Sequence, residues 1–241
     1  MVPAHNERDR LPRCLSALRV AAARVAVPVR LIVVADACTD DTAALAAAGG
    51  AEVVTITARN VGRARAAGAA RALKAGRARR RDAAGTAAGE GRARGRRVDW
   101  IATTDADSRV PQGWLRRQLD HARDGADLVA GTVEVDDWSG WPHPLPSEYQ
   151  RRYAERVAGD RHGHVHGANL GVRATAYVAA GGFPPVAHDE DRALVAAVRG
   201  NGGQVVFDSR CPVLTSARPD GRAPGGFSVH LKNLYDRSVF L

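Results

Sequence analysis

The sequence predicts an α/β fold in which a mostly parallel, Rossmann-like sheet is flanked by helices within a single domain. Short apolar runs rich in β-branched residues alternate with segments of helical periodicity, which is the pattern of βαβ units. The chain has 241 residues and 45% of them are hydrophobic, which is enough for one such domain with a sizeable core.

The first half alternates regularly between helix and strand. Apolar residues recur at helical spacing near the N-terminus, continuous apolar runs such as VRLIVVA are typical of buried parallel strands, and short polar turns separate them. The predicted elements are a helix over 8–24, a strand over 29–35, a helix over 42–48, a strand over 52–57, a helix over 63–78 and a strand over 98–104.

The second half shows the same alternation less clearly. Residues 136–148 are rich in Pro and Trp and are expected to form a loop, and the tail after Ser216 is Gly- and Pro-rich as far as Gly226, which indicates a lid or a disordered end. The predicted elements are a helix over 114–123, a strand over 127–135, a helix over 149–158, a strand-like segment over 165–178, a helix over 190–200 and a strand over 204–208.

The composition excludes several classes of protein. No apolar run approaches the ~18–20 residues that a membrane-spanning helix needs, and the first ten residues lack the apolar stretch of a signal peptide. Cys14, Cys38 and Cys211 are few and widely spaced, which indicates reduced thiols rather than a disulfide framework or a zinc site. We therefore expect a cytoplasmic protein.

Most of the net charge of +9 comes from one segment. Residues 71–97 hold ten Lys or Arg side chains against two acidic ones. We expect the part over 79–97 to form a mobile insertion, either simply solvated or in peripheral contact with anionic lipid at the inner face of a membrane. No aromatic residue lies among these arginines, so no nucleic-acid partner is expected.

Three polar clusters follow predicted strands, at 4–7, 36–41 and 105–107. Ligands of open parallel sheets bind outside the carboxyl ends of the strands, so these distant segments should converge on one crevice. In the third cluster, Asp105 and Asp107 are one residue apart, and two carboxylates aimed at the same side repel each other unless a cation lies between them.

Five segments resemble the family 2 glycosyltransferases of GT-A fold. In the family's order they are VPAHNE at 2–7, VVADACTDDT at 33–42, RNVGRARAAGAAR at 59–71, DAD at 105–107 and GGFPPVAHDEDRALVAAVRGNGG at 181–203. The DAD triplet alone is a weak signal, but the ordered set is a strong one and covers about residues 2–210. The resemblance implies a nucleotide-sugar-binding half over 1–110, an acceptor-binding half over 111–215 and a tail over 216–241.

The activity implied by the resemblance is metal-dependent transfer of a sugar from a nucleotide-sugar donor, with a UDP-sugar expected, to an acceptor hydroxyl with inversion of configuration. The acceptor is a glycan, a lipid-linked or a small molecule. Mg²⁺ or Mn²⁺ held by carboxylates would neutralise the departing diphosphate. Asp107 is the expected metal ligand, and Asp105 would contact the ribose, or the metal through water. The alternative is a solvated turn in which Asp107 caps the next helix.

The resemblance also supplies the other donor-binding residues. Asp36 would accept a hydrogen bond from the base, and Ala4 and Asn6 would meet the base or ribose. Glu7 would accept from a ribose hydroxyl, and Arg63 would contact the diphosphate. Three of these roles have an alternative. Asp36 would form an Asx turn, Glu7 would be an acidic residue in the first turn of a helix, and Arg63 would be an exposed arginine at a helix start.

The catalytic base is expected among the acidic residues of 189–191. An attacking hydroxyl must lose its proton, and a carboxylate opposite the leaving group can accept it. The resemblance implies that Asp191, of the family's Glu-Asp pair, is the base, and that Glu190 or Asp189 orients it or binds the acceptor; the alternative is an acidic first helical turn favoured by the helix dipole. HGAN at 166–169 resembles the family's acceptor-side segment, which implies that His166 and Asn169 lie on the acceptor side.

Three further features each allow two interpretations. The histidines of RHGHVHG at 161–167 alternate as on one face of a strand, which suits a metal site or a loop that lines the acceptor site. Trp138 and Trp141 would stack on a sugar or pack within a loop. Arg218 or Arg222 would meet phosphate if the tail is a lid.

The first strand departs from the family pattern. The family places roughly five apolar residues before the proline of VPAHNE, whereas only Met1 and Val2 precede Pro3 here. Each missing buried aliphatic side chain would remove ~1.5–3 kcal/mol of burial. We expect a start upstream of Met1 or, as the alternative, an impaired protein that only binds ligands. A sugar nucleotidyltransferase is a further alternative, although PAHNERDR lacks the glycines that its phosphate loop would need.

Overall fold

The computed structural model describes residues 1–85, 99–159, 161–221 and 226–239. Two sheets form the centre of the molecule. The first is parallel, in the order β1 (Val2–Ala4), β2 (Ile32–Asp36), β3 (Glu52–Ile56). The second has the order β4 (Trp100–Thr103), β8 (Leu170–Arg173), β5 (Leu128–Val135), β9 (Val205–Thr215). Strand β8 is antiparallel to both neighbours, and β5 is parallel to β9.

Met1 connects the two sheets. Its backbone nitrogen donates to the carbonyl of Ala102 at 2.6 Å, and its carbonyl accepts from the N–H of Thr104 at 3.3 Å. This is the hydrogen-bond pattern of a parallel ladder, so β1 runs beside β4 in the same direction. The carboxyl ends of β1, β2 and β4 therefore open on one edge, where the three polar clusters begin.

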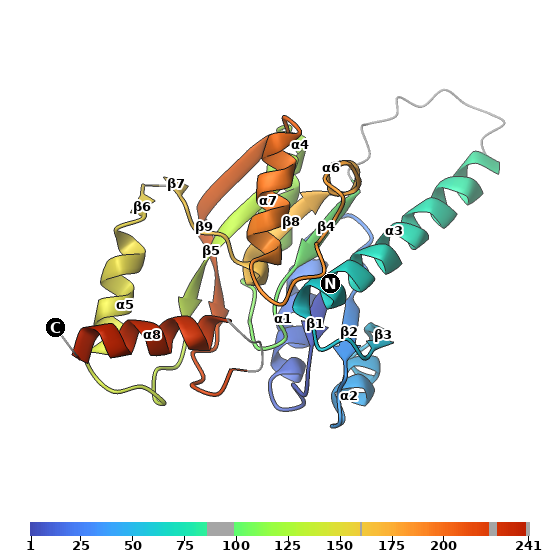
Figure 1. Cartoon of the computed structure of the whole chain (residues 1–241). Coiled ribbons are helices and arrows are strands. Elements are labelled where there is room, and N and C mark those ends of the chain that lie inside the picture. The colour runs from blue at the N-terminus through green and yellow to red at the C-terminus, as the bar shows by residue number, and fades with distance from the viewer. Residues whose placement is uncertain (86–98, 160, 222–225, 240–241) are drawn as a thin grey trace.

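Helices cover both faces of this sheet. Their bounds are α1 (Leu11–Ala23), α2 (Thr42–Ala48), α3 (Val61–Gly85), α4 (Trp114–Arg123), α5 (Leu145–Ala154), α6 (Ala174–Ala179), α7 (Glu190–Gly200) and α8 (Phe227–Val239). One buried cluster packs α1 and α4 against the sheet, and another packs α3, α6 and α7 against it. Figure 1 shows α7 in front of the strands of the second sheet and α3 extending away from the first.

A third apolar cluster joins α5 to α8, which lie side by side in Figure 1. Its buried members are Leu145, Tyr149, Ala217, Leu231 and Leu234. The tail is therefore helical over 227–239, where a lid or a disordered end was expected. The Gly- and Pro-rich stretch ends at 226, and the apolar residues after it recur at helical spacing and pack on α5.

Most other elements lie where the sequence predicts them. Helices α2, α4 and α7 have the predicted bounds, whereas β9 continues to Thr215 because pairing with β5 resumes after a register shift between Gly131 and Val133. Helix α3 extends to Gly85, beyond the predicted end at 78. The remainder of the expected basic insertion, 86–98, lies outside the described residues. Over 165–178 the chain forms a 3₁₀ turn (Gly167–Asn169), β8 and α6.

None of the helices in the described ranges combines the length and the hydrophobicity that are needed to cross a lipid bilayer.

The register shift in β5 places Gly131 against the buried amide of Asn169, and this contact yields a first prediction. A Cβ at Gly131 would lie 2.2 Å from Nδ2 and 2.4 Å from Cγ of Asn169. We expect Gly131→Ala to lower the free energy of unfolding by about 1–3 kcal/mol, measured by urea denaturation. Gly200→Ala is the matched control, because no atom lies within 4 Å of its added Cβ. Equal effects of the two substitutions would contradict the described packing.

Candidate functional site

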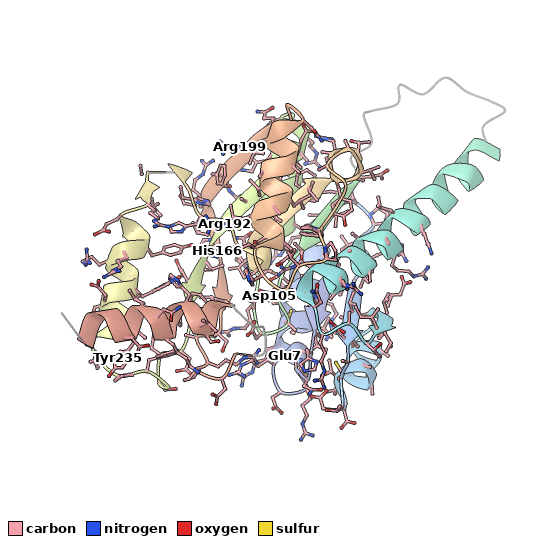
Figure 2. The ribbon with its side chains drawn as sticks, viewed as in Figure 1. Glu7, Asp105, His166, Arg192, Arg199 and Tyr235 are labelled. Carbon is pink, nitrogen blue, oxygen red and sulfur yellow. The ribbon has the colours of Figure 1, made fainter. Side chains whose placement is uncertain are left out.

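One cavity of about 1200 Å³ is lined by residues from all three polar clusters. It lies at the carboxyl ends of β1, β2 and β4 and is bounded by the first turns of α3 and α7 and by α5 and α8. Figure 2 shows Glu7, Asp105, His166 and Arg192 gathered in this region. The sequence-predicted residues that line it are Ala4, Glu7, Asp36, Asp105, Asp107, His166, Glu190 and Asp191.

Asp107 is a buried carboxylate in an acidic environment. Its side chain is 16% exposed, and burial, with the nearby charges of Asp105 and Glu7, raises its pKa to about 7 against the opposing field of Arg218. Arg218 Nη2 lies 3.3 Å from Oδ2 of Asp107. The same guanidinium forms a two-pronged pair with Glu7, with Nη1 2.9 Å from Oε2. A cation therefore does lie among these carboxylates, and the tail supplies it.

Arg65 is a site residue that the sequence analysis missed. Its guanidinium is 4% exposed and pairs with Asp105 at 2.5 Å and with Glu190. Gly167 covers it so closely that an added Cβ would lie 2.2 Å from its Cζ. Arg65 is four residues before Ala69 on the buried face of α3, and an arginine on a buried helical face is the signal that could have found it.

Asp191 lies in the first turn of α7 and lines the cavity. Its Oδ2 accepts from the N–H of Gly167 at 2.7 Å, and its Oδ1 accepts from the N–H of Arg192 at 2.7 Å. Burial raises the pKa of this carboxyl, while Arg65 and the two N–H groups oppose the rise. The result is a fixed carboxylate with an enhanced affinity for a proton, as a general base requires. Its neighbour Glu190 is 3% exposed and turns toward Arg65.

Asp36 organises the loop that leads into α3. Its Oδ1 accepts from the N–H groups of Ala58 at 2.7 Å and Arg59 at 2.8 Å, and its Oδ2 accepts from that of Asn60 at 2.8 Å. The carboxylate is buried at the end of β2 and lines the cavity together with Ala4 of β1. Its observed partners are backbone groups, and contact with a base stays a prediction.

Three predicted site residues do not line the cavity. Asn6 has a left-handed backbone (φ 54°), and its amide oxygen accepts from the N–H of Thr39 at 2.7 Å. Arg63 points outward from α3. Asn169 is 3% exposed, and its amide accepts from the indole of Trp114 and donates to two backbone carbonyls, at 2.8, 2.8 and 2.9 Å. Asn169 therefore joins α4 to the second sheet instead of facing an acceptor.

The histidine motif forms a stack. The ring centroids of His162 and His164 are 5.9 Å apart, those of His164 and His166 are 5.8 Å apart, and Tyr153 stacks on His164 at 3.8 Å. Among the described residues, no three His, Cys, Asp or Glu side chains are arranged to hold a metal ion by themselves. Since His164 and His166 line the cavity, the geometry favours the acceptor-lining interpretation of this motif.

The two loop tryptophans pack within the α5–α8 cluster. The ring of Trp138 lies 5.4 Å from that of Tyr149, and the indole N–H of Trp141 donates to the carbonyl of Ala217. Neither tryptophan lines the cavity. The geometry therefore favours the packing interpretation over the sugar-stacking one.

The donor set fits a divalent cation in chemistry and in charge. Five carboxylates interact with the two guanidinium groups of Arg65 and Arg218, and they are those of Glu7, Asp105, Asp107, Glu190 and Asp191. Two positive charges leave most of this negative charge uncompensated, and carboxylate oxygens are the ligands that Mg²⁺ and Mn²⁺ prefer. Asp107 would hold the ion, and Asp105, already paired with Arg65, would contact the ribose, or the ion through water.

Comparison with known proteins identifies the family of this chain. The family model described as "Glycosyltransferase like family 2" matches residues 1–216. The chain belongs to this family. The match confirms the resemblance to family 2 glycosyltransferases and the prediction that the protein is a glycosyltransferase. A search of curated protein sequences finds no match to this family 2 member.

Solved structures share the fold at low sequence identity. S. aureus TarS 1–349 in complex with UDP-GlcNAc has a TM-score of 0.60 and 13% identity, over 97% of this chain and 63% of that one. Mannosyltransferase PcManGT from Pyrobaculum calidifontis in complex with GDP-Man and Mn²⁺ has a TM-score of 0.60 and 17% identity, over 97% of this chain and 68% of that one. Glucosyl-3-phosphoglycerate synthase from Mycobacterium tuberculosis in complex with Mn²⁺, UDP and phosphoglyceric acid has a TM-score of 0.54 and 16% identity, over 97% of this chain and 75% of that one.

The GT-A fold predicted from the motifs is confirmed by these neighbours. The chain spans 59–63% of the length of the TarS 1–349 structures that it matches, so the match covers a part of that protein.

The buried position of Arg65 yields a second prediction. Arg65→Met leaves Glu190 buried without its partner, and we expect a loss of about 3–5 kcal/mol in the free energy of unfolding, measured by urea denaturation. Arg63→Met, on the exposed face of the same helix, should change it by less than about 0.5 kcal/mol.

A double variant separates the charge effect from lost packing. Arg65→Met combined with Glu190→Gln should recover part of the loss, because the second substitution removes the unpaired charge. If Arg65→Met and Arg63→Met were equally mild, the buried ion pair would not exist in solution.

The histidine stack yields a prediction for acid stability. Burial, followed by the field of the neighbouring histidines, lowers the pKa of His166 to about 3. The unfolded chain takes up this proton below about pH 6.5 and the folded chain does not, so stability falls as the pH drops from about 6.5 toward 3, by about 1.4 kcal/mol per pH unit. Denaturation at pH 7 and pH 5.5 should show a smaller acid-induced loss in His166→Gln than in the parent. His188→Gln, at an exposed position, should behave like the parent, and a parent-like loss in His166→Gln would contradict the described burial.

Proposed function

We propose that this family 2 glycosyltransferase transfers a sugar from a nucleotide-sugar donor, with a UDP-sugar as first choice, to an acceptor hydroxyl in a single inverting displacement that depends on Mg²⁺ or Mn²⁺. One observation carries the proposal: Asp107, after β4, and Asp191, in the first turn of α7, line the same cavity. A metal-ligating carboxylate and a general base are the two groups that such a displacement needs.

The donor would bind at the acidic end of the cavity. When bound, a divalent ion held by Asp107 would supply charge neutralisation for the departing diphosphate. Arg218 already contacts Asp107 and Glu7, and a guanidinium in this position suits contact with phosphate oxygens. In support, the structures of PcManGT and of glucosyl-3-phosphoglycerate synthase contain Mn²⁺, and those of TarS and the synthase contain uridine nucleotides.

Asp191 would accept the proton of the attacking hydroxyl. Two backbone N–H groups fix its carboxylate, and burial makes the protonated form easier to reach. Arg65 holds Glu190 away from the proton transfer and limits the rise in the pKa of Asp191. The carboxylate is thus kept ionised until the hydroxyl arrives, which is the state that a general base requires.

The remaining expectations stand as parts of this proposal. Residues 1–110 would bind the donor and residues 111–215 the acceptor, with α8 of the tail closing the acceptor side. The enzyme would act in the cytoplasm, where its described cysteines, which are free thiols, stay reduced. Contact of the basic segment 71–97 with the inner face of a membrane would bring it to a lipid-linked acceptor.

The two carboxylates should fail in different ways. Asp107→Ala should abolish Mn²⁺-dependent binding of UDP, because the ion loses a ligand. Asp191→Asn should keep that binding within about twofold and lower kcat at least ~100-fold, because only the proton acceptor is lost. Calorimetry with UDP and Mn²⁺, and turnover of a panel of UDP- and GDP-sugars, measure the two effects. Parent protein that takes up no nucleotide with either metal would contradict the proposal.

A further inference from the structure

The side of the cavity formed by α5 and the 162–166 segment has a rigid aromatic floor. The hydroxyl of Tyr153 accepts from the N–H of Val133 at 2.9 Å and lies 3.1 Å from Nε2 of His166. Nε2 of His164 lies 3.0 Å from the carbonyl of Tyr153. The polar atoms of this floor are thus engaged with one another, and its rings are stacked on one another, so the floor is held in place by its own contacts.

The floor carries no positive charge of its own near neutral pH. Burial lowers the pKa of His162, His164 and His166, the last to about 3. Arginines stay protonated at every relevant pH and are therefore the side chains best able to supply positive charge on this side of the cavity.

Two arginines border the floor without a close carboxylate partner. The charge of Arg156 acts on His164 and that of Arg192 acts on His166, whose rings are 5.8 Å apart. Figure 2 shows Arg192 and His166 close together. Among the described residues, no carboxylate forms an ion pair with Arg156, and Arg192 has only the exposed Asp189 at 4.0 Å. By contrast, Arg151 and Arg152 on α5 are both paired with Glu148.

Charge is therefore divided along the cavity. The part around Asp107 is strongly acidic and would repel an anionic acceptor, whereas Arg156 and Arg192, beside His164 and His166, attract one. Arg192 follows Asp191 directly in the first turn of α7. An anion bound to Arg192 would hold a hydroxyl only a few bonds away within reach of the proposed base.

We propose that Arg156 and Arg192 form an anion subsite and that the acceptor carries a phosphate or carboxylate group close to the hydroxyl that reacts. This inference rests on the proposed function, whose acceptor class it names. The two guanidinium groups hold its anion by charge-assisted hydrogen bonds, and the stacked rings of Tyr153 and His164 form the neutral wall of the cavity beside it.

Matched pairs of acceptors test the subsite. Full-length protein, with and without saturating UDP and Mn²⁺, is titrated with glycerol 1-phosphate against glycerol, with glyceric acid against glycerol, and with glucose 6-phosphate against glucose. A second arm uses vesicles of phosphatidylglycerol against vesicles of phosphatidylcholine. Calorimetry for the soluble compounds and co-sedimentation for the vesicles report binding without turnover.

The anionic member of at least one pair should bind about tenfold more tightly than its neutral counterpart, and Arg156→Ala and Arg192→Ala should each remove about tenfold of its affinity. Arg116→Ala, a 74% exposed side chain on α4 outside the cavity, should leave it unchanged. A preference confined to vesicles identifies a lipid headgroup as the source of the anion, and a preference among the soluble pairs identifies a small anionic acceptor.

Equal binding of anionic and neutral members in both arms would overturn the subsite, as would a preference that both arginine variants retain. Uptake of UDP with Mn²⁺ is scored separately in the same protein. If the nucleotide fails to bind while the arginine-dependent anion preference persists, the donor part of the proposed function fails and the anion subsite stands.

Discussion

The buried guanidinium of Arg65 is the interaction on which the geometry of the site depends. It lies on α3 and pairs with Asp105 at the end of β4 and with Glu190 at the start of α7. These three elements come from distant parts of the sequence, and the ion pairs of Arg65 join their polar ends where Gly167 packs closely on the guanidinium. Breaking one partner of such a buried group costs far more than a surface ion pair contributes. The same contact therefore links stability to the alignment of the carboxylates to which we assign metal binding and proton transfer.

Charge is distributed so that each part of the cavity has a distinct chemistry. Carboxylates collect where β1 and β4 end, and one tail arginine, Arg218, partly neutralises them. A divalent ion held by Asp107 would add positive charge where it is lacking, next to the guanidinium of Arg218. On the α5 side, neutral stacked rings and two arginines create a different environment. Under the proposed function, this separation would give the metal-bound donor and the anionic acceptor different parts of one cavity.

Local sequence patterns could predict the parallel strands, the exact bounds of α2, α4 and α7, and the convergence of the polar clusters. The elements follow from the periodicity of apolar residues, and the convergence follows from the geometry of open sheets. Contacts between distant segments could not be predicted in the same way. Arg65 was missed because its role depends on α7 packing over α3, and Arg63, two residues earlier, faces outward. Asn169 sits in a family motif, yet its amide is used by Trp114 and two carbonyls. The tail showed turn-forming residues before the apolar spacing that makes α8, so its pairing with α5 was not apparent.

The most direct test of the account is a crystal structure of the protein with UDP and Mn²⁺, with diffraction data collected at the manganese edge. The account predicts one anomalous peak in bonding contact with the carboxylate of Asp107 and the diphosphate, and within the same cavity as Asp191. A nucleotide bound elsewhere, or a diphosphate in the cavity with no manganese peak beside Asp107, would contradict it.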